Sequence, residues 1–278
     1  MTWIDAHNHL HDLRLAPYRD EIIREIRRDA WAAAVVNGTR EDDWPAVAAL
    51  ARAEPWVRPA FGLHPWYVAG RSPDWHERLI AHLEAFPDAT IGEIGLDRWI
   101  EGHDLPTQME VFRAQLLVAR LRQLPVTIHC LRAWGALWDE LSAGDVAPRA
   151  FLLHAYGGPA EMVGTLEKRG AYFSFSAYFL HERKARQREV FARISLDRLL
   201  VETDAPDLAP PPDYPGAQFF SDVETGRPLN TPLNLALTYE ALAQIRGLSV
   251  ADLASQVAQN FERLFGTCRR LPAGSPST

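Results

Sequence analysis

Short apolar segments alternate with amphipathic or alanine-rich segments from one end of the chain to the other. The apolar segments predict eight strands, at 4–10, 31–38, 57–63, 90–95, 125–130, 150–154, 171–176 and 199–203. Helices are predicted after them, at 17–30, 41–53, 74–86, 107–124, 133–141, 159–169, 182–194, 233–246 and 249–265. Eight strands that alternate with helices predict parallel pairing and a closed, TIM-like (β/α)8 barrel. An open doubly wound sheet is the alternative, but no GxGxxG fingerprint follows the first strand.

Length and composition favour a single domain. The chain has 278 residues, 47% hydrophobic and 23% charged, and one α/β barrel takes about 250 residues. We predict one domain over 1–270 and a flexible tail over 271–278. The long, proline-rich connection 205–232 follows the last strand, so we expect it to lie over the barrel mouth. Thr107 and Ser249 are predicted to cap the helices that begin there.

Charge and cysteine content argue against a basic nucleic-acid-binding protein and against a disulfide-rich secreted protein. A net charge of -7 argues against binding nucleic acid through a broad basic surface, although a metal site could still attract phosphate locally. Two cysteines, Cys130 and Cys268, are too few for a disulfide scaffold and suggest a reducing compartment. No signal-peptide pattern and no apolar run of about 18 residues is visible. We expect a cytoplasmic protein without membrane contact, as a monomer or weak homo-oligomer.

Two histidines lie one residue apart in the first predicted strand. Residues i and i+2 of a strand face the same side, so His7 and His9 would point together, with Asp5 behind them. The HxH match is weak by itself. However, residues that commonly bind metals also occur in or directly after later predicted strands, namely His64, Glu93, His129, His154 and Asp204. The ends of barrel strands meet at one rim, so this pattern predicts a metal site there.

The donor types indicate hydrolysis. Four imidazoles and two carboxylates can hold two divalent ions if one carboxylate bridges, and Glu93 is placed to do so. Mixed nitrogen and oxygen ligands suit Zn, Mn, Fe or Mg, and we expect Mg, Mn or Zn. A metal pair about 3.5 to 4 Å apart clamps attacking and leaving oxygens and activates water near neutral pH. Asp204 could bind one ion and also act as general base.

Other mechanisms lack their motifs. The chain has no GxSxG, HExxH, P-loop or paired CxxC pattern. Cys130 would point away from the side that His129 faces, so we interpret it as structural. Five further histidines fall in predicted helices or loops and are expected to be solvated: His11, His76, His82, His103 and His181.

These motifs together resemble the TatD family of metal-dependent hydrolases, within the amidohydrolase-like superfamily. The matching stretches keep the family's order: IDAHNHL (4–10), FGLHP (61–65), IGEIGLD (91–97), the run from Gln108 through PVTIHC (125–130), FLLHAYGG (151–158), YFSFS (172–176), LLVETDAP (199–206), PLNTPLNL (228–235) and NFERLFG (260–266). The resemblance implies a TIM-like barrel with a usually dinuclear site. It assigns one ion to His7, His9, Glu93 and Asp204, and the other to Glu93, His129 and His154. It also implies that His64 lines the pocket near the scissile phosphate without binding metal.

Family members include DNases with exonuclease activity on single strands and enzymes that deacylate D-aminoacyl-tRNA. We therefore expect a deoxyribonuclease acting on single-stranded DNA. An ester or amide hydrolase resembling the deacylases is the alternative, and a non-catalytic metal-binding barrel is disfavoured by the complete ligand set. Candidate substrate contacts are His64, Arg98, Trp99, Arg132, Tyr156 and Arg227, as cations or donors for phosphate and rings for base stacking. For the three arginines, solvated surface or salt bridges are an equal alternative.

Overall fold

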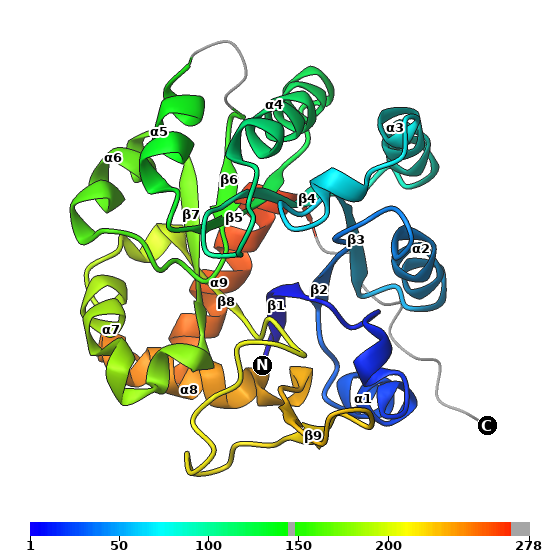
Figure 1. The fold of residues 1–278 in the computed structure, drawn as a ribbon. Helices are drawn as coiled ribbons and strands as arrows, with labels where there is room; N and C mark the ends of the chain where they lie inside the picture. The colour runs from blue at the N-terminus through cyan, green and yellow to red at the C-terminus, as the bar shows by residue number, and fades with distance from the viewer. Residues whose placement is uncertain (144–147, 268–278) are drawn as a thin grey trace.

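The structure, a computed structural model, describes residues 1–143 and 148–267 (Figure 1). Each long strand pairs in parallel with the next one along the chain, and the order in the sheet is the order in the sequence. The strands are β1 (Ile4–Asn8), β2 (Ala33–Asn37), β3 (Val57–Phe61), β4 (Thr90–Asp97), β5 (Val126–Leu131), β6 (Phe151–Leu153), β7 (Ala171–Ser176) and β8 (Leu199–Glu202). The predicted TIM-like barrel is confirmed.

The helices surround the strands (Figure 1). They are α1 (Arg19–Arg28), α2 (Trp44–Ala53), α3 (Trp75–Ala85), α4 (Leu105–Arg122), α5 (Trp134–Ser142), α6 (Val163–Lys168), α7 (Ala185–Phe191), α8 (Leu235–Arg246) and α9 (Val250–Phe265). Most strands are buried on both faces, which explains apolar runs such as AAVVN in β2 and FLL in β6. None of these helices is long and apolar enough to cross a membrane.

Helix α9 connects strands on different sides of the barrel at their N-terminal ends. The Asn260 side chain donates hydrogen bonds to the carbonyls of Leu196 and Leu199, at the start of β8. Five residues further along, at the last residue of the helix, the Phe265 carbonyl accepts a hydrogen bond from the Arg58 guanidinium, near the start of β3. Figure 1 shows α9 crossing behind the barrel between these strands. Because α9 contacts the N-terminal ends of the strands, it does not cover their C-terminal ends, where a functional site can form.

The seam between β1 and β8 is joined by a side chain as well as by main-chain contacts. Asp204 N donates to the His7 carbonyl (3.0 Å), and His9 N donates to the Ala205 carbonyl (2.8 Å). Behind the two histidines, the buried Asp5 carboxylate accepts hydrogen bonds from Thr203 N (3.1 Å) and Thr203 Oγ1 (2.6 Å). Burial raises the pKa of Asp5 to about 7, although these hydrogen bonds favour its charged form. Asp5 therefore helps to close the barrel.

Three local expectations had different outcomes. Ser249 caps α9 as predicted, but α4 is capped by Asp104, not Thr107, because Leu105 and Pro106 already form its first turn. Residues 205–232 lie at the rim where they begin and again near their end, where the Asn230 side chain donates to the Thr203 carbonyl (2.7 Å). Between these points they extend to α1 (Figure 1), where β9 (Phe220–Ser221) and β10 (Pro228–Leu229) form a hairpin. The ring of Phe220 stacks there on Tyr18. The predicted tail 271–278 lies outside the described residues.

Candidate metal centre

The six predicted metal ligands converge at the C-terminal side of the barrel. Their side chains are nearly or fully buried, except that of His129, which is 15% exposed. Two come from β4 and β5, and the others from β1, the residue after it, and the residues that follow β6 and β8. Their donor atoms, together with His64, form three overlapping groups within 4.8 Å: His7, His9 and Asp204; His7, Glu93 and His154; His64, Glu93 and His129.

One half of the centre has four facing donor atoms. His7 Nε2 and His9 Nε2 lie 3.2 Å apart. Glu93 Oε2 lies 3.4 and 3.3 Å from these two nitrogens, and Asp204 Oδ1 lies 3.1 and 3.4 Å from them. Ligands about 2.0 to 2.1 Å from a tetrahedral ion are about 3.3 to 3.4 Å from one another. The His7, His9 and Asp204 atoms thus have the spacing of ligands to one divalent ion, and Glu93 Oε2 lies beside both imidazole nitrogens.

The other half uses the second oxygen of the same carboxylate. Glu93 Oε1 lies 3.0 Å from His129 Nδ1 and 2.8 Å from His154 Nε2, and these two nitrogens are 3.2 Å apart. The His154 ring also stacks on His7, with centroids 4.1 Å apart. Glu93 therefore lies between the two histidine groups, as its position in β4 predicts.

Neighbouring acceptors fix which nitrogen of His9 and of His129 faces the centre. His9 Nδ1 donates to the Asn37 carbonyl (2.7 Å), and His129 Nε2 donates to Asp97 Oδ2 (2.9 Å). The nitrogen opposite each of these donors then presents a lone pair to the centre, as metal-binding histidines do. Asp204 Oδ1 is buried and receives no hydrogen bond from a described residue. Lone pairs that face carboxylate oxygens at this distance need a cation between them, so these residues fit a bound metal.

The charges agree with this interpretation. Burial by itself lowers the pKa of His9 and of His154. Nearby carboxylates, chiefly Asp204 for His9 and Glu93 for His154, outweigh burial and raise both pKa values well above the usual range. Burial raises the pKa of Glu93 and Asp204, yet the surrounding histidines lower both below their usual range. The carboxylates are therefore ionised at neutral pH, and the centre attracts positive charge as protons or metal.

His64 differs from the other histidines of the site. Its Nδ1 accepts a hydrogen bond from Trp66 N (3.2 Å), so the neutral ring carries its proton on Nε2. That nitrogen lies 3.4 Å from Glu93 Oε1. Burial lowers the pKa of His64 to about 4, so the ring is neutral at physiological pH. His64 thus presents an N–H donor, and not a lone pair, beside the centre, which agrees with the expectation that it lines the pocket.

Several residues that the sequence analysis did not assign hold the ligands in place. The end of β2 and the loop after it accept hydrogen bonds from two ligands and from His64: the Asn37 carbonyl from His9 Nδ1, the Gly38 carbonyl from Glu93 N (2.9 Å), and the Thr39 carbonyl from His64 N (2.8 Å). Asp97 orients His129 by accepting its hydrogen bond. Burial alone would raise the pKa of Asp97, but hydrogen bonds from His129, Trp99 and Trp66 outweigh it and lower this pKa to about 2. Of these residues, only Asp97 could have been found from the sequence, because it is the acidic residue at the end of IGEIGLD (91–97). Carboxylates commonly accept a hydrogen bond from the outer nitrogen of a metal-binding histidine.

Local irregularities in the backbone aim two of the ligands. The pairing of β4 with β5 shifts register between Ile91 and Ile94, next to Glu93, and such irregularities redirect side chains. Gly95 has φ 152°, and a Cβ there would lie 1.9 Å from the His129 carbonyl oxygen, so only glycine fits. Asp204 has φ 55°, a left-handed conformation that aspartate tolerates better than most residues. These conformations bring strand ends into one centre.

The remaining predicted contacts are scattered. Arg98, Trp99 and Arg132 are exposed at the ends of β4 and β5, and Arg227 is exposed on the hairpin beside α1. Tyr156 is fully buried, its ring packs against Trp134 and Phe173, and its hydroxyl donates to the Pro159 carbonyl. The expectation that Tyr156 stacks on a base is therefore not met, because its ring belongs to the core.

Two other expectations concern residues near the site. His11 is not solvated as expected: it is 5% exposed, lies against His9, and its Nε2 is 3.4 Å from Asp43 Oδ2. The turn after β1 folds it back under the loop that follows β2. Cys130 is half-buried, and burial raises the pKa of its thiol, which makes it a poor nucleophile and agrees with a structural role.

Comparison with known proteins gives one consistent family. A family profile described as TatD related DNase matches residues 4–266. The "3'-5' ssDNA/RNA exonuclease TatD" of Erwinia tasmaniensis is 29% identical over 256 residues, 91% of this chain and 95% of the relative. The "uncharacterized metal-dependent hydrolase YabD" of Bacillus subtilis is 26% identical, covering 94% and 98%. The crystal structure of the TatD homologue YjjV from Escherichia coli superimposes with a TM-score of 0.84 at 26% identity, covering 95% and 98%.

Proposed function

We propose that this chain, which belongs to the family of TatD-related DNases, is a metal-dependent hydrolase that releases nucleotides from single-stranded nucleic acid. The observation that carries the proposal is the set of lone pairs and carboxylate oxygens, 2.8 to 3.4 Å apart, around the shared Glu93. A TatD relative is named as a 3'-5' exonuclease on single-stranded DNA and RNA. We further propose the cytoplasm as its location and a monomer or weak homo-oligomer as its state.

The six ligands would hold two divalent ions. His7, His9, Asp204 and Oε2 of Glu93 would hold one, and Oε1 of Glu93, His129 and His154 the other. When bound, such ions lower the pKa of water and offset the charge that develops on the phosphoryl oxygens. The donor set of imidazole and carboxylate is compatible with Mg, Mn or Zn.

The protein's own residues would supply proton transfer and hydrogen bonding. Asp204 is ionised, because its pKa lies below the usual range, and it lies within the ligand group, so it can accept a proton as general base. His64 would donate its Nε2 proton to a phosphoryl oxygen, a role that suits a neutral imidazole next to Glu93.

The test is nucleotide release from single-stranded oligonucleotides labelled at the 3' or the 5' end. Chelator-treated protein is supplied in turn with Mg, Mn or Zn, and elemental analysis counts the bound ions. We expect release that needs metal and is lost in Glu93→Ala. Glu110→Ala is the matched control, because Glu110 is 72% exposed on α4 and lies outside the centre. The label that is released first gives the polarity.

Two outcomes would contradict the proposal. If no metal supports release although two ions are bound, the chain is not a nuclease, and turnover of aminoacyl esters would then favour the ester or amide hydrolase. If Asp204→Ala retains its metal and its full rate, Asp204 is not the general base.

A further inference from the structure

We propose that Trp66 and Trp99 form a stacking subsite for one nucleobase of a single-stranded nucleic acid, beside the phosphodiester that is hydrolysed. The inference rests on the proposed function and adds the part of the substrate that the protein grips. Trp66 follows His64 by two residues, and Trp99 follows Asp97 by two. Both rings therefore lie on loops that leave the metal centre.

The two indole rings pack against each other and remain open to solvent. Their centroids are 6.2 Å apart and their planes are inclined by 28°. Trp66 is 41% exposed and Trp99 is 54% exposed. Large aromatic surfaces usually become buried, so a stacked, exposed pair at the rim of a candidate active site indicates a ligand that covers it. A flat aromatic group that extends the stack is the ligand that fits.

One carboxylate fixes this pair relative to the metal centre. Asp97 Oδ2 accepts hydrogen bonds from Trp66 Nε1 (2.8 Å) and from His129 Nε2 (2.9 Å). Asp97 Oδ1 accepts from Trp99 N (2.6 Å). The Asp97 side chain is fully buried. Its backbone is held by the Gln108 amide, which accepts from Asp97 N and donates to the Asp97 carbonyl. The position of the rings is thus tied to His129, as a subsite that positions a reacting phosphate requires.

The charges near the pair match a nucleic-acid strand. Arg98 precedes Trp99, and Arg132 follows Leu131, whose carbonyl accepts a hydrogen bond from Arg98 N (2.9 Å). Both side chains are exposed, and neither forms an ion pair with any residue in 1–143 or 148–267. In a chain of net charge -7, two unpaired guanidinium groups supply local attraction for phosphates. Bases in a duplex are already stacked on both faces, so the pair selects single strands, without preference for one base.

The first test changes Trp99, whose side chain can be removed while its backbone N–H still bonds to Asp97. For a single-stranded oligonucleotide we expect Trp99→Ala to raise KM about 5- to 150-fold, the usual value of one base–aromatic stack, with a smaller change in kcat. Trp99→Phe should restore most of the loss, and Trp99→Leu should not, because it lacks a π-face. Leu121→Ala, at an apolar side chain on α4 that is 74% exposed, is the control and should change nothing.

The second test moves a single abasic residue through the oligonucleotide. If one base stacks on the pair, Trp99→Ala raises KM for the intact strand but not for the strand that lacks this base. An unchanged KM, or the same increase with every abasic strand, would overturn the proposal. Equilibrium binding of these strands, measured by fluorescence anisotropy, makes the same comparison without turnover. Absence of hydrolysis would then count against the proposed function, and loss of the abasic dependence against the subsite.

Discussion

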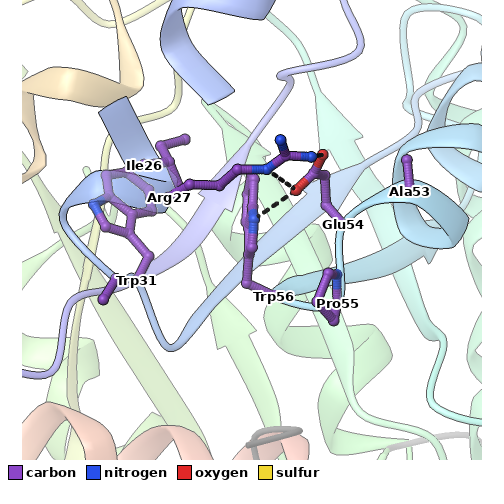
Figure 2. Close-up of a pocket in the computed structure, with 8 residues that line it drawn as sticks. Ile26, Arg27, Trp31, Ala53, Glu54, Pro55 and Trp56 are labelled. Carbon is purple, nitrogen blue, oxygen red and sulfur yellow. Dashed lines mark hydrogen bonds and ion pairs between the residues drawn. The ribbon is translucent and has the colours of Figure 1, made fainter. Parts of the chain in front are cut away.

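Strands β2 and β3 lead from a pocket at their N-terminal ends to the metal centre at the opposite end. Figure 2 shows the pocket, which lies between the ends of α1 and α2; its lining residues are Ile26, Arg27, Ala30, Trp31, Ala53, Glu54, Pro55 and Trp56. There, the buried Glu54 carboxylate accepts hydrogen bonds from the Arg27 guanidinium and from Trp56 Nε1 (2.9 Å). Trp31 packs edge-on against Trp56.

The metal centre also buries carboxylates, but with a different result. Glu93 and Asp204 face imidazole nitrogens. In His9 and His129 the opposite ring nitrogen carries the proton and donates it to Asn37 and Asp97. Asp204 Oδ1 receives no hydrogen bond from a described residue. A buried carboxylate whose hydrogen-bond donors are in place needs no further partner, whereas carboxylates that face imidazole lone pairs need a cation between them. The difference distinguishes a structural ion pair from a binding site on the same scaffold, although both contain a buried glutamate.

The largest expected effect comes from exchanging these two glutamates for alanine in turn. Glu93→Ala should lower metal-dependent nucleotide release about a thousandfold or more, since loss of the metal ions removes several kcal/mol of transition-state stabilisation. Glu54→Ala should leave the rate within about twofold, because Glu54 lies at the other end of the barrel. Rates of nucleotide release are measured at saturating metal, with folding checked by circular dichroism. An equal loss of rate in both variants would contradict the distinction between a metal-binding and a structural glutamate.

Asp97 should have an intermediate effect. Asp97→Asn turns a carboxylate that accepts from His129, Trp66 and the Trp99 backbone into an amide with a single accepting oxygen. Changes in such outer partners lower metal affinity or activity about 10- to 100-fold. Metal titration by calorimetry and the rate of nucleotide release should both show the loss. Wild-type affinity in this variant would mean that Asp97 does not orient the ligand.

Metal should stabilise the protein increasingly as pH rises. The pKa values of His9 and His154 are raised in the metal-free fold, so their protonated forms stabilise it at low pH. That contribution is lost as pH rises through the raised pKa values, whereas metal must displace these protons and binds better at high pH. The metal-induced increase in Tm should therefore grow as pH rises above about 6.5, the ordinary pKa of histidine. Metal at about 100 times Kd contributes about 2.7 kcal/mol. Glu93→Ala should show no such increase.

The smallest expected effect is on folding, at the N-terminal pocket. Glu54→Ala leaves the Trp56 indole N–H without its acceptor in a buried position, which costs about 1 to 3 kcal/mol. The Arg27 side chain is 60% exposed, so water replaces its lost partner. Urea unfolding should show this loss in the free energy of unfolding with the metal response intact. A lost metal response would mean that the two ends are coupled.

Much of the candidate site could be predicted because it follows local rules. The spacing of His7 and His9 places both on one side of β1, and His129, His154 and Asp204 occur in or just after short apolar segments that form strands. Tyr156 was misassigned because it lies only two residues after His154, and the sequence does not show that its ring packs into the core there. Trp66 gave no signal, since its partner Trp99 belongs to another loop.

By itself, the sequence determined the alternation of strands and helices, and with it the barrel and the rim on which the ligand types gather. Periodicity and composition act over a few residues, so a single sequence displays them. The tertiary structure decided which nitrogen of His9 and of His129 faces the centre, through acceptors such as Asn37, which is 28 residues from His9. It also decided the closure of the barrel by Asp5 and Thr203, 198 residues apart, and the pairing of Trp66 with Trp99. These contacts join segments that only folding brings together, and no local pattern encodes them.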